Sequence, residues 1–368
     1  MKSALRKIHR YVSLALAALW LVQALTGILM VFHWELDDAM VAGEHRPVSP
    51  LAVAAAAQRV QRERPESKVV ALYATAGSAD RFDIYVDNAL GNTDIVRVDG
   101  SGQTLMARPL DYDYRRAGLI QAAIVLHQTL FAGDGGKFFL GFRAIILLPN
   151  IIMGLTLAWP RRAEWRRALF PQASRVRVAN LFSWHRAVGL WLALPSMVLI
   201  FAGMLAAFEE PLDHFLGTGV PPAILADIHS TRVHSLATAT VAPAVAMQVA
   251  LQQFPAATPT SMRMPRQNAP WYEVWMKQPG EARRVYGQTA VYVSAEDGRF
   301  IAISDALKAS WTQRFVFALV PTHTGEIAGL PGRLLAMAVG VGLLTMLVLG
   351  VTLWSGRRRS RSVSSPVT

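Results

Sequence analysis

Four histidines occupy matched positions in the two halves of this chain. His9 and His185 lie 176 residues apart, and each precedes an arginine at the start of an apolar stretch. His127 and His323 lie 196 residues apart, and each opens the pattern His-x5-Gly-x2-Gly followed by Lys or Arg. An imidazole in or beside lipid is costly unless it has a partner. The matched histidines therefore predict ligation of a metal ion or of haem iron.

Other residues repeat at the same two offsets, which indicates an internal duplication. The pairs 176 residues apart include Gly27 and Gly203, Phe32 and Phe208, Leu36 and Leu212, and Asp37 and Asp213. The pairs 196 residues apart include Gly133 and Gly329, Gly136 and Gly332, Lys137 and Arg333, Gly154 and Gly350, and Thr156 and Thr352. Glycines inside apolar helices leave room for a planar group or serve close helix packing. Each half therefore brings two histidines to a similar environment.

The elements that must position these histidines are long apolar helices. The chain has 368 residues, of which 52% are hydrophobic, and this is more apolar than an ordinary soluble protein. A bilayer core takes about 20 apolar residues, and the stretches of that length are roughly 11–34, 137–159, 184–208 and 333–354. We expect four membrane helices, the first of them retained rather than removed as a signal peptide.

The distribution of basic residues predicts the orientation in the membrane. A net charge of +12 would suit a nucleic-acid-binding protein, but the basic residues cluster at 2–10, 161–177 and 357–361. The long loops at 35–118 and 209–310 mix acids with bases. By the positive-inside rule, both termini are cytoplasmic and both long loops lie outside. A nucleic-acid partner is therefore not expected.

Several kinds of chemistry are excluded by residue types. The chain has no cysteine, which excludes disulfides, iron–sulfur clusters and covalently attached c-type haem. It contains neither G-x-S-x-G nor H-E-x-x-H, so hydrolase chemistry has no recognisable centre. It also lacks a dinucleotide fingerprint, and no NADH or FAD site is predicted.

Each long loop is predicted to contain a small α+β module of about 60 residues, which is close to the lower limit for independent folding. The first module is expected to have a helix at 50–64 and strands at 68–75, 81–87 and 94–98. The second is expected to have a helix at about 242–254 and strands near 271–277, 289–294 and 299–303. The strands follow the alternation of apolar and polar residues that is typical of half-buried strands.

Two sequence segments carry a resemblance to a known family. Leu126-His-Gln-Thr-Leu-Phe-Ala-Gly133, running on to Gly136, and Trp184-His-Arg-Ala-Val-Gly-Leu-Trp191 resemble the most specific stretches of the PepSY-associated transmembrane family. The likeness covers essentially residues 1–356. Members of this family include bacterial inner-membrane ferric-siderophore reductases that hold two haems in a four-helix bundle. The resemblance therefore implies a membrane α-helical fold with two periplasmic PepSY-like modules and two haem b groups.

The expected organisation follows the chain. Its parts are transmembrane helix 1 at 1–34, the first periplasmic module at 35–118, a re-entrant or short helix with transmembrane helix 2 at 119–160, a basic cytoplasmic loop at 161–183, transmembrane helix 3 at 184–208, the second module at 209–310, a short helix with transmembrane helix 4 at 311–356, and a basic cytoplasmic tail at 357–368. We therefore expect the four transmembrane helices to contact the lipid bilayer.

The resemblance implies an inner haem near the cytoplasmic face, with His9 and His185 as axial ligands. Arg10 and Arg186 follow these histidines, and a guanidinium matches the carboxylate of a haem propionate. The alternative is that each His-Arg pair simply faces the lipid headgroups.

The outer haem is expected to have His127 and His323 as ligands, the alternative being that they cap a re-entrant loop. His33 breaks the symmetry, because its repeat partner is Glu209. It lies near the outer end of the first apolar stretch. We leave open whether His33 is an alternative axial ligand, a propionate contact, part of a substrate surface or a solvated interfacial histidine.

The function implied by the resemblance is reduction of a ferric siderophore or other ferric chelate. Electrons would pass from the inner to the outer haem and reduce the ferric ion, which hard oxygen ligands hold far more tightly than ferrous ion. The chelate would dock outside on Trp271 and Trp275, with Arg115 and Arg116 attracting its oxygens. The alternative for the tryptophans is packing in the module core.

Two other functions remain open. One is a non-enzymatic PepSY membrane protein with a binding or regulatory role, and the other is a haem reductase of a different periplasmic acceptor. The electron donor, quinol or a cytoplasmic reductase, has no recognisable motif in the chain, and neither the chelate nor the oligomeric state is encoded in a readable pattern.

Overall fold

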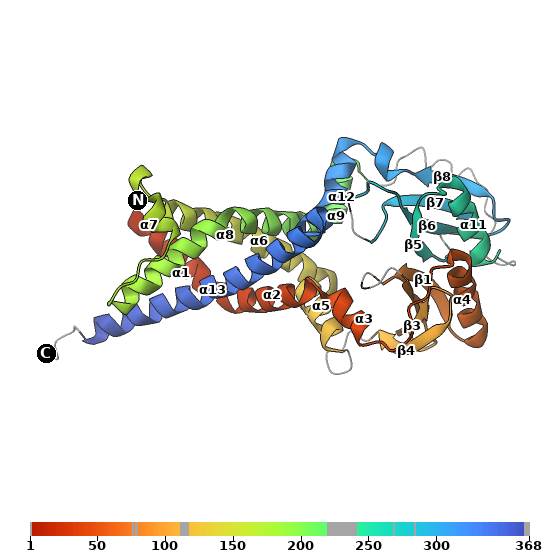
Figure 1. Cartoon of the computed structure of the whole chain (residues 1–368), viewed down its shortest axis with the longest axis horizontal. Helices are drawn as coiled ribbons and strands as arrows, with labels where there is room; N and C mark the ends of the chain where they lie inside the picture. Colours follow the sequence, from red (N-terminus) through yellow and green to blue (C-terminus); the bar gives the residue numbers. More distant parts are fainter. Residues whose placement is uncertain are drawn as a thin grey trace. The chain divides into compact units, whose positions relative to one another are not determined.

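The structure is a computed structural model that describes residues 2–75, 77, 80–110, 118–218, 241–267, 269–282 and 285–363. The chain forms two compact units, each assembled from both halves of the sequence (Figure 1). The helical unit comprises Met1–Val31, Ala123–Phe208 and Thr322–Thr368. The α+β unit comprises Phe32–Ala122 and Glu209–Pro321.

The helical unit contains long apolar helices. They are α1 (Lys2–Ala15), α2 (Ala17–Met30), α6 (Gly133–Ala158), α8 (Arg177–Ala207) and α13 (Gly329–Val363), with the short η1 (Arg162–Glu164), α7 (Trp165–Leu169) and η3 (Glu326–Ala328). Within the described residues, α6, α8 and the segment that holds most of α13 are long and apolar enough to cross a membrane, and α1 with α2 makes a fourth if that bent pair is one span. Large apolar side chains such as Phe142 and Leu194 are exposed on these helices, as expected for contact with lipid.

The first apolar stretch differs from the single straight helix expected at 1–34. It is broken near Leu16 into α1 and α2, which are inclined by 62°. Sharp helix bends normally occur at Pro or Gly, and the sequence has neither at this point. The short helix that follows, α3 (His33–Ala39), belongs to the other unit.

The long helices form a closed ring with repeat symmetry. α1 contacts α6, α6 contacts α8, α8 contacts α13, and α13 contacts α2. The contact of α6 with α8 is thus the counterpart of that between α13 and α2. Small residues permit these approaches: Gly340 of α13 faces Ile28 of α2, and Gly189 of α8 faces Met346.

The α+β unit is built on one antiparallel sheet of eight strands. The strands are β1 (Lys68–Ala74), β2 (Arg81–Asp87), β3 (Thr93–Asp99), β4 (Thr104–Leu110), β5 (Thr258–Arg263), β6 (Trp271–Lys277), β7 (Thr289–Ser294) and β8 (Phe300–Ser304). Their order is β4-β3-β2-β1-β5-β6-β7-β8. The two modules therefore share one sheet through the pairing of β1 with β5.

Two helices, α4 (Pro50–Glu63) and α11 (Pro243–Gln253), pack on each other and on the same face of this sheet (Figure 1). At the junction, Leu72 of β1 and Met262 of β5 are cross-strand partners and are almost fully buried. The helices and this face form one hydrophobic core. A shared core explains how modules of about 60 residues can be stable, because each alone would bury too little surface.

Further short elements lie between these helices and strands in the sequence. They are α5 (Leu119–Thr129), α9 (Glu209–Leu216), η2 (Ala306–Lys308) and α12 (Trp311–Thr324). α5 and α12 correspond to the short helices expected before the second and fourth spans. α3 and α9 begin at His33 and Glu209, 176 residues apart, so the repeat continues beyond the spans.

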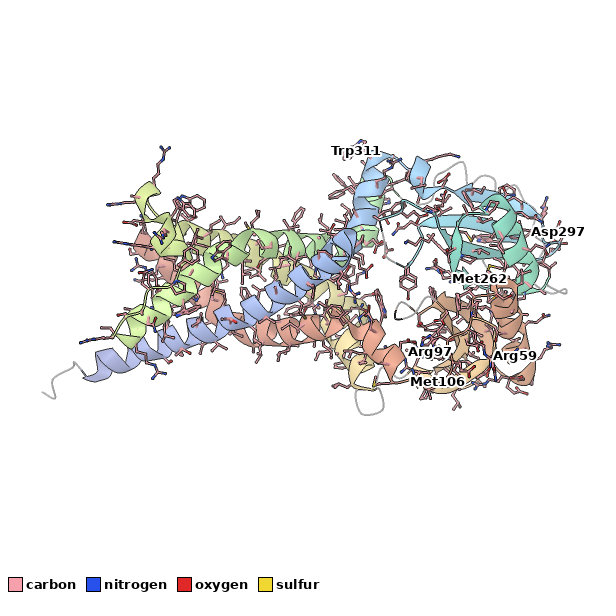
Figure 2. The ribbon with its side chains drawn as sticks, in the orientation of Figure 1. Arg59, Arg97, Met106, Met262, Asp297 and Trp311 are labelled. Atoms are coloured by element: carbon pink, nitrogen blue, oxygen red, sulfur yellow. The ribbon has the colours of Figure 1, made fainter. Side chains whose placement is uncertain are left out.

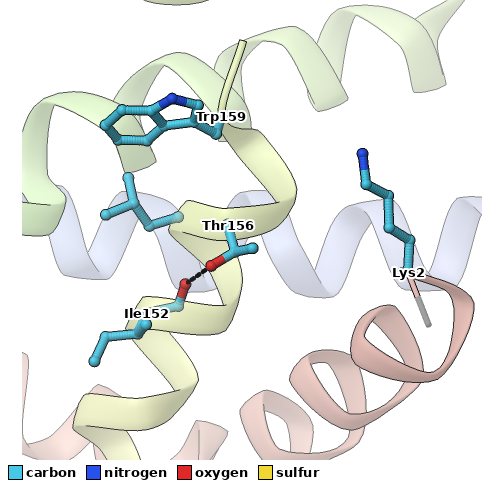
Figure 3. A pocket seen from close by; sticks show the side chains of 5 residues that line it. Lys2, Ile152, Thr156 and Trp159 are labelled. Carbon is cyan, nitrogen blue, oxygen red and sulfur yellow. Dashed lines mark hydrogen bonds between the residues drawn. The ribbon is translucent and has the colours of Figure 1, made fainter.

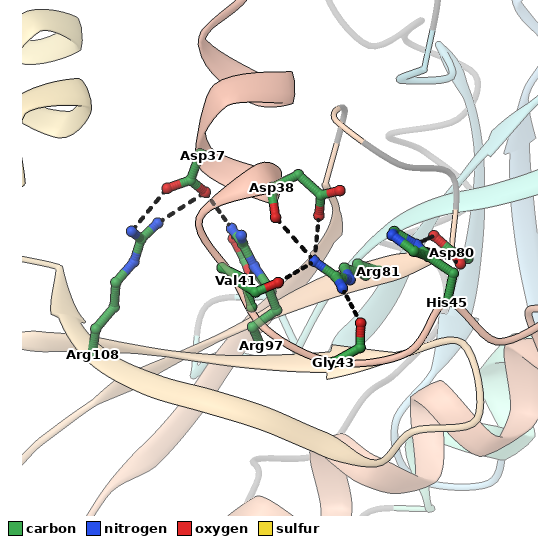
Figure 4. Close-up of polar contacts among 10 residues, drawn as sticks. Asp37, Asp38, Val41, Gly43, His45, Asp80, Arg81, Arg97 and Arg108 are labelled. Carbon is green, nitrogen blue, oxygen red and sulfur yellow. Dashed lines mark hydrogen bonds and ion pairs between the residues drawn. The ribbon is translucent and has the colours of Figure 1, made fainter.

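An ion-pair cluster ties α3 to the sheet (Figure 4). Arg97 of β3 bonds Asp83 of β2 with two contacts of 2.7 and 2.8 Å, and bonds Asp37 of α3 at 2.7 Å. Arg108 of β4 also bonds Asp37, at 2.9 Å. Burial alone would raise the pKa of Asp37, but the hydrogen bonds and charges of Arg108 and Arg97 outweigh it and lower the pKa below 3.8. The stabilisation by Asp37 is therefore complete at neutral pH and is lost only as the pH falls below that value.

A second arginine holds the chain segment that follows α3. Arg81 of β2 is 1% exposed and donates to the Asp38 carboxylate at 3.0 Å. It also donates to the carbonyl oxygens of Val41 and Gly43, at 3.1 and 2.8 Å. Both arginines therefore position the chain where it leaves the first span.

We expect Arg97→Gln to destabilise the protein by about 3–5 kcal/mol, because it leaves buried carboxylates without their partner. Arg97 is 3% exposed in this cluster. The matched control is Arg299→Gln, whose partner Asp297 is 55% exposed (Figure 2) and whose loss should cost less than about 1 kcal/mol. Thermal unfolding in detergent measures both variants, and equal midpoints would show that the cluster adds nothing to stability.

Candidate functional site

His127 and His323 meet inside the helical unit. Their ring centres are 6.3 Å apart and the rings are inclined by 35°. An imidazole nitrogen binds a metal at about 2.0–2.1 Å and lies about 1 Å from the ring centre, so two imidazoles on opposite sides of one ion have centres about 6 Å apart. The spacing of this pair therefore fits two imidazoles that would hold one metal ion between them.

Hydrogen bonds orient both rings for ligation. His127 Nδ1 lies 2.9 Å from the Thr26 hydroxyl, which itself donates to the Val22 carbonyl at 2.7 Å. The Thr26 oxygen therefore accepts from Nδ1–H of His127. His323 Nδ1–H donates to the Leu199 carbonyl at 2.8 Å. With the proton on Nδ1, the lone pair of each ring is on Nε2, which is the usual arrangement of a metal-ligating histidine.

His9 has the same type of hydrogen bond. Its Nδ1 lies 3.0 Å from the Asn150 backbone oxygen and 3.1 Å from the Asn150 side-chain oxygen. The Asn150 side-chain nitrogen donates to Ser13 at 2.9 Å, and this fixes the amide so that its oxygen faces His9. Asn150 is 1% exposed. Its counterpart 196 residues later is Met346, so His185 is held differently from His9.

Each of the four histidines faces one of the repeat-matched glycines. A Cβ atom on Gly27 would lie 3.1 Å from the His127 ring, and one on Gly203 would lie 2.5 Å from the His323 ring. The equivalent distances are 2.8 Å between Gly154 and His9 and 3.5 Å between Gly350 and His185. Every contact joins a histidine and a glycine of the same half. The glycines therefore keep the space into which the rings project.

His185 lies far along the bundle from the pair of His127 and His323. On the continuous helix α8, His185 precedes Gly203 by 18 residues, which is about 27 Å along the axis. This is close to the thickness of a bilayer core, roughly 30 Å. The expected inner and outer levels are consistent with this separation.

The glycines of the His-x5-Gly-x2-Gly pattern form the turn after each outer histidine. A Cβ atom on Gly136 would collide with the Thr129 carbonyl, and one on Gly332 would collide with the Gly325 carbonyl. Thr129 and Gly325 are themselves 196 residues apart. In the first half, Leu130 (φ 51°) and Phe131 (φ 58°) also adopt the left-handed conformation, which is uncommon for such residues and is concentrated at functional sites.

The arginines expected beside the inner histidines differ in their surroundings. Arg186 Nε donates to the Ala158 carbonyl at the end of α6, at 2.9 Å. The Arg10 guanidinium lies 4.7 Å from the centre of the Tyr11 ring, and its Nε is buried with no hydrogen-bond partner among the described residues. Arg10 thus retains a donor for an anionic group, whereas Arg186 Nε is engaged by the backbone.

The structure adds three residues that the sequence did not single out. Thr26 and Asn150 orient His127 and His9, as described above. The third is Arg143 of α6, whose Nε and Nη1 are buried without a hydrogen-bond partner in the described part of the chain. A charged residue in an apolar span is a functional signal and would have identified Arg143.

The residue types present favour haem over a bare metal ion. Among the described residues, no three His, Cys, Asp or Glu side chains gather as a metal site. A bare ion such as zinc takes three or four protein ligands, whereas haem iron needs only axial ones. Paired histidines facing glycines, with buried arginine donors nearby, therefore fit haem.

The expected substrate-contact residues lie in the α+β unit. Trp271 and Trp275 project from β6 on the sheet face opposite α4 and α11, whereas Tyr272 is buried in the core and donates to the Val241 carbonyl at 2.6 Å. The indole N–H groups of both tryptophans are buried without a partner among the described residues. The main core thus accounts for Tyr272, whereas Trp271 and Trp275 pack against a second hydrophobic cluster of Ala290, Tyr292 and Ala302 on the other face.

Charged groups flank these tryptophans. Arg263 of β5 lies 6.0 Å from the Trp275 ring centre and 3.4 Å from Glu273. Burial would lower the pKa of Arg263, but interactions with Tyr73 and Glu273 outweigh it and raise the pKa. Burial raises the pKa of the neighbouring Tyr292 to about 12. This face therefore combines indole donors, a cation and a neutral phenol.

The other expected residues are not all described. His33 begins α3 in the α+β unit, and its ring lies 4.6 Å from that of Trp34. Arg115 and Arg116 lie outside the described residues.

The helical unit also has an open, mostly apolar cavity of about 570 Å³ between α1 and α6 (Figure 3). Lys2, Ile152, Leu155, Thr156 and Trp159 line it. The Thr156 hydroxyl donates to the Ile152 carbonyl at 2.8 Å. The lining does not include the four histidines, so this cavity is distinct from the histidine site.

Comparison with known families gives one match over nearly the whole chain. The family described as the PepSY-associated TM region matches residues 6–357. No curated protein matches this chain.

Proposed function

This chain belongs to the PepSY-associated transmembrane family, and we propose that it is a membrane electron-transfer protein that uses two haem b groups to reduce a ferric chelate in the periplasm. The observation that carries the proposal is the pair of His127 and His323, with ring centres 6.3 Å apart and both Nδ1 atoms hydrogen-bonded. Bound haem would supply a one-electron couple within the apolar bundle.

The chain's own residues would fix the properties of the two sites. Thr26 and Leu199 hold the tautomer of the outer histidines, and Asn150 holds that of His9. Hydrogen bonds of this kind increase the basicity of a ligating imidazole. Apolar helices around the sites exclude water. His9 and His185 each lie at the start of an apolar stretch, beside a cluster of basic residues, and would form the inner site.

We propose that the protein lies in the bacterial inner membrane, with both termini inside and the α+β unit in the periplasm. Basic residues gather near the chain ends and in the loop between α6 and α8, as the positive-inside rule requires. We expect reporter fusions at residues 70 and 270 to be active outside and a fusion near residue 170 to be active inside. A cytoplasmic signal from residue 70 or 270 would contradict this topology.

The ferric chelate is proposed to dock at Trp271 and Trp275, on the sheet face opposite α4 and α11. Their indole N–H groups would donate to oxygens of the chelate, and Arg263 would attract its negative charge. Arg115 and Arg116 remain proposed contacts. One electron would convert ferric to ferrous iron and weaken its hold by hard oxygen ligands.

We expect Trp275→Ala to slow reoxidation of the reduced protein by an anionic ferric chelate roughly tenfold, as for the loss of a central aromatic contact. Stopped-flow absorbance measures the rate, and haem content should stay unchanged. The matched control is Trp311→Ala, because Trp311 is 79% exposed in α12 (Figure 2). Equal rates in both variants would remove this face from the docking site.

The function itself is tested with the wild-type protein. The reduced protein is mixed anaerobically with a ferric hydroxamate or catecholate and a ferrous-specific chromogenic chelator. We expect haem oxidation to release ferrous iron in equal electron equivalents. If the haem stays reduced with every ferric chelate, the protein is not a ferric reductase. It would then be an electron carrier for another acceptor.

A further inference from the structure

Arg143 is a partly buried cation within a membrane helix. It lies in α6, ten residues after Gly133, which is about 15 Å along the axis. Its Nε and Nη1 are buried and have no hydrogen-bond partner among the described residues. A guanidinium in an apolar bundle is costly without a partner, and intramembrane arginines normally pair with an anion or a carbonyl.

The helix position directs Arg143 into the bundle. Arg143, Leu147, Asn150 and Gly154 follow one another at spacings of four, three and four residues, so they share one face of α6. Leu147 and Asn150 are 4% and 1% exposed, and Gly154 faces His9. Arg143 therefore lies on the face that holds a ligand histidine.

Repeat symmetry shows that the bundle itself does not require a cation here. The residue 196 positions after Arg143 is Val339 of α13, which is 2% exposed. An apolar side chain fills the equivalent place in the second half. Gly141, two residues before Arg143, faces Phe208 at the end of α8, and Gly203, five residues before Phe208, faces His323. Arg143 therefore lies near the level of the outer histidines. The local charge is therefore positive and calls for an anion next to the outer histidines.

We propose that Arg143 binds a carboxylate of the group held by His127 and His323, which is a haem propionate in the proposed function. This inference rests on that function and adds a residue to it. The guanidinium presents a planar fork of donors that matches a carboxylate. The equivalent residue in the second half is Val339, which cannot bind a carboxylate. The bound group would therefore have an arginine partner from the first half only.

The test compares haem retention in Arg143→Gln and Arg143→Lys with wild type. Transfer of haem from the purified full-length protein to apomyoglobin gives the rate of loss, and a redox titration gives the potential of the outer site. We expect outer-site haem to be retained roughly 10- to 100-fold less tightly in Arg143→Gln, the range for loss of a supporting contact. Its potential should fall, because an uncompensated carboxylate favours ferric iron. Lysine keeps the charge but loses the fork, and should give an intermediate result.

The matched control is Arg161→Gln, an exposed arginine just beyond the same helix, which should behave as wild type. In a His127→Ala background, Arg143→Gln should cause no further loss of haem if both residues serve one site. Wild-type retention and potential in Arg143→Gln would overturn the inference while leaving the proposed function intact. Wild-type protein without haem would instead refute the function. Monodisperse elution in detergent verifies that each variant is folded.

Discussion

The His127→Ala and His323→Ala proteins are each expected to contain one haem per chain in place of two. The two rings have centres 6.3 Å apart and would together hold one haem, so removal of either would leave that haem with a single histidine in an apolar site. The inner site is about 27 Å away along α8 and should keep its haem. Haem extracted from the purified variants, divided by protein concentration, measures the loss.

The control for this experiment is His45→Ala. His45 lies in the α+β unit, is 57% exposed and pairs with Asp80, so its removal should leave two haems. A specific result would contradict the assignment: full haem content in His127→Ala together with half the content in His33→Ala. His33 would then be the axial ligand of the outer site.

The second large effect is expected for His9→Ala and His185→Ala. Each variant should lose the inner haem and keep the outer one. Its spectrum should therefore equal the difference between the wild-type spectrum and that of His127→Ala. Reduction by a cytoplasmic donor in inverted vesicles should fall to the background rate, because the entry site is missing. Dithionite should still reduce the outer haem.

The neighbouring residue Asn150 offers a graded version of the same experiment. Asn150→Leu removes the acceptor side chain from His9 and should weaken haem retention at the inner site about 10- to 100-fold. The backbone acceptor of Asn150 remains, so the loss should be smaller than in His9→Ala. Two haems and full donor-driven reduction in His9→Ala would contradict the inner assignment.

The repeat pattern predicted that His127 and His323 would meet, and their ring centres are 6.3 Å apart. The offsets of 176 and 196 paired each histidine with its equivalent, and the matched glycines proved to face the histidine rings. Family membership was also correct, as the match over residues 6–357 shows. These features were accessible because chemically distinctive residues recur at fixed spacing in both halves.

The residues that orient the histidines could not be predicted from the pattern. Asn150 is 141 positions from His9 and Thr26 is 101 positions from His127, so only the fold brings them together. Asn150 also has no equivalent in the second half, where Met346 stands, and repeat symmetry could not reveal it. Arg143 is asymmetric in the same way.

The sheet illustrates a different limit. β4 and β5 were not predicted as strands, because each contains a proline and lacks clear alternation. β4 is an edge strand, where proline is tolerated. β5 is central, and its Pro259 lies at a register shift against β6, which accommodates the missing donor. Because β5 was not predicted, the pairing of β1 with β5 that joins the two modules into one sheet could not be predicted from the sequence.

The strand expected near 271–277 is β6, and its residues alternate between the two faces of the sheet. Its residues are alternately half-buried and buried, from Trp271 to Lys277. Tyr272 accordingly joins the core, while Trp271 and Trp275 lie on the other face. Because both tryptophans pack against a second cluster, Ala290, Tyr292 and Ala302, the period of two separates the faces of β6 but does not distinguish packing residues from candidate contacts.

The four matched histidines are proposed to hold two haem b groups in this membrane protein. The most direct test is the visible spectrum of the detergent-purified protein, dithionite-reduced minus air-oxidised, together with the haem content per chain. We expect sharp b-type bands and two haems per chain. A colourless, folded and monodisperse protein, purified from cells supplied with haem, would contradict the claim and favour a binding or regulatory role.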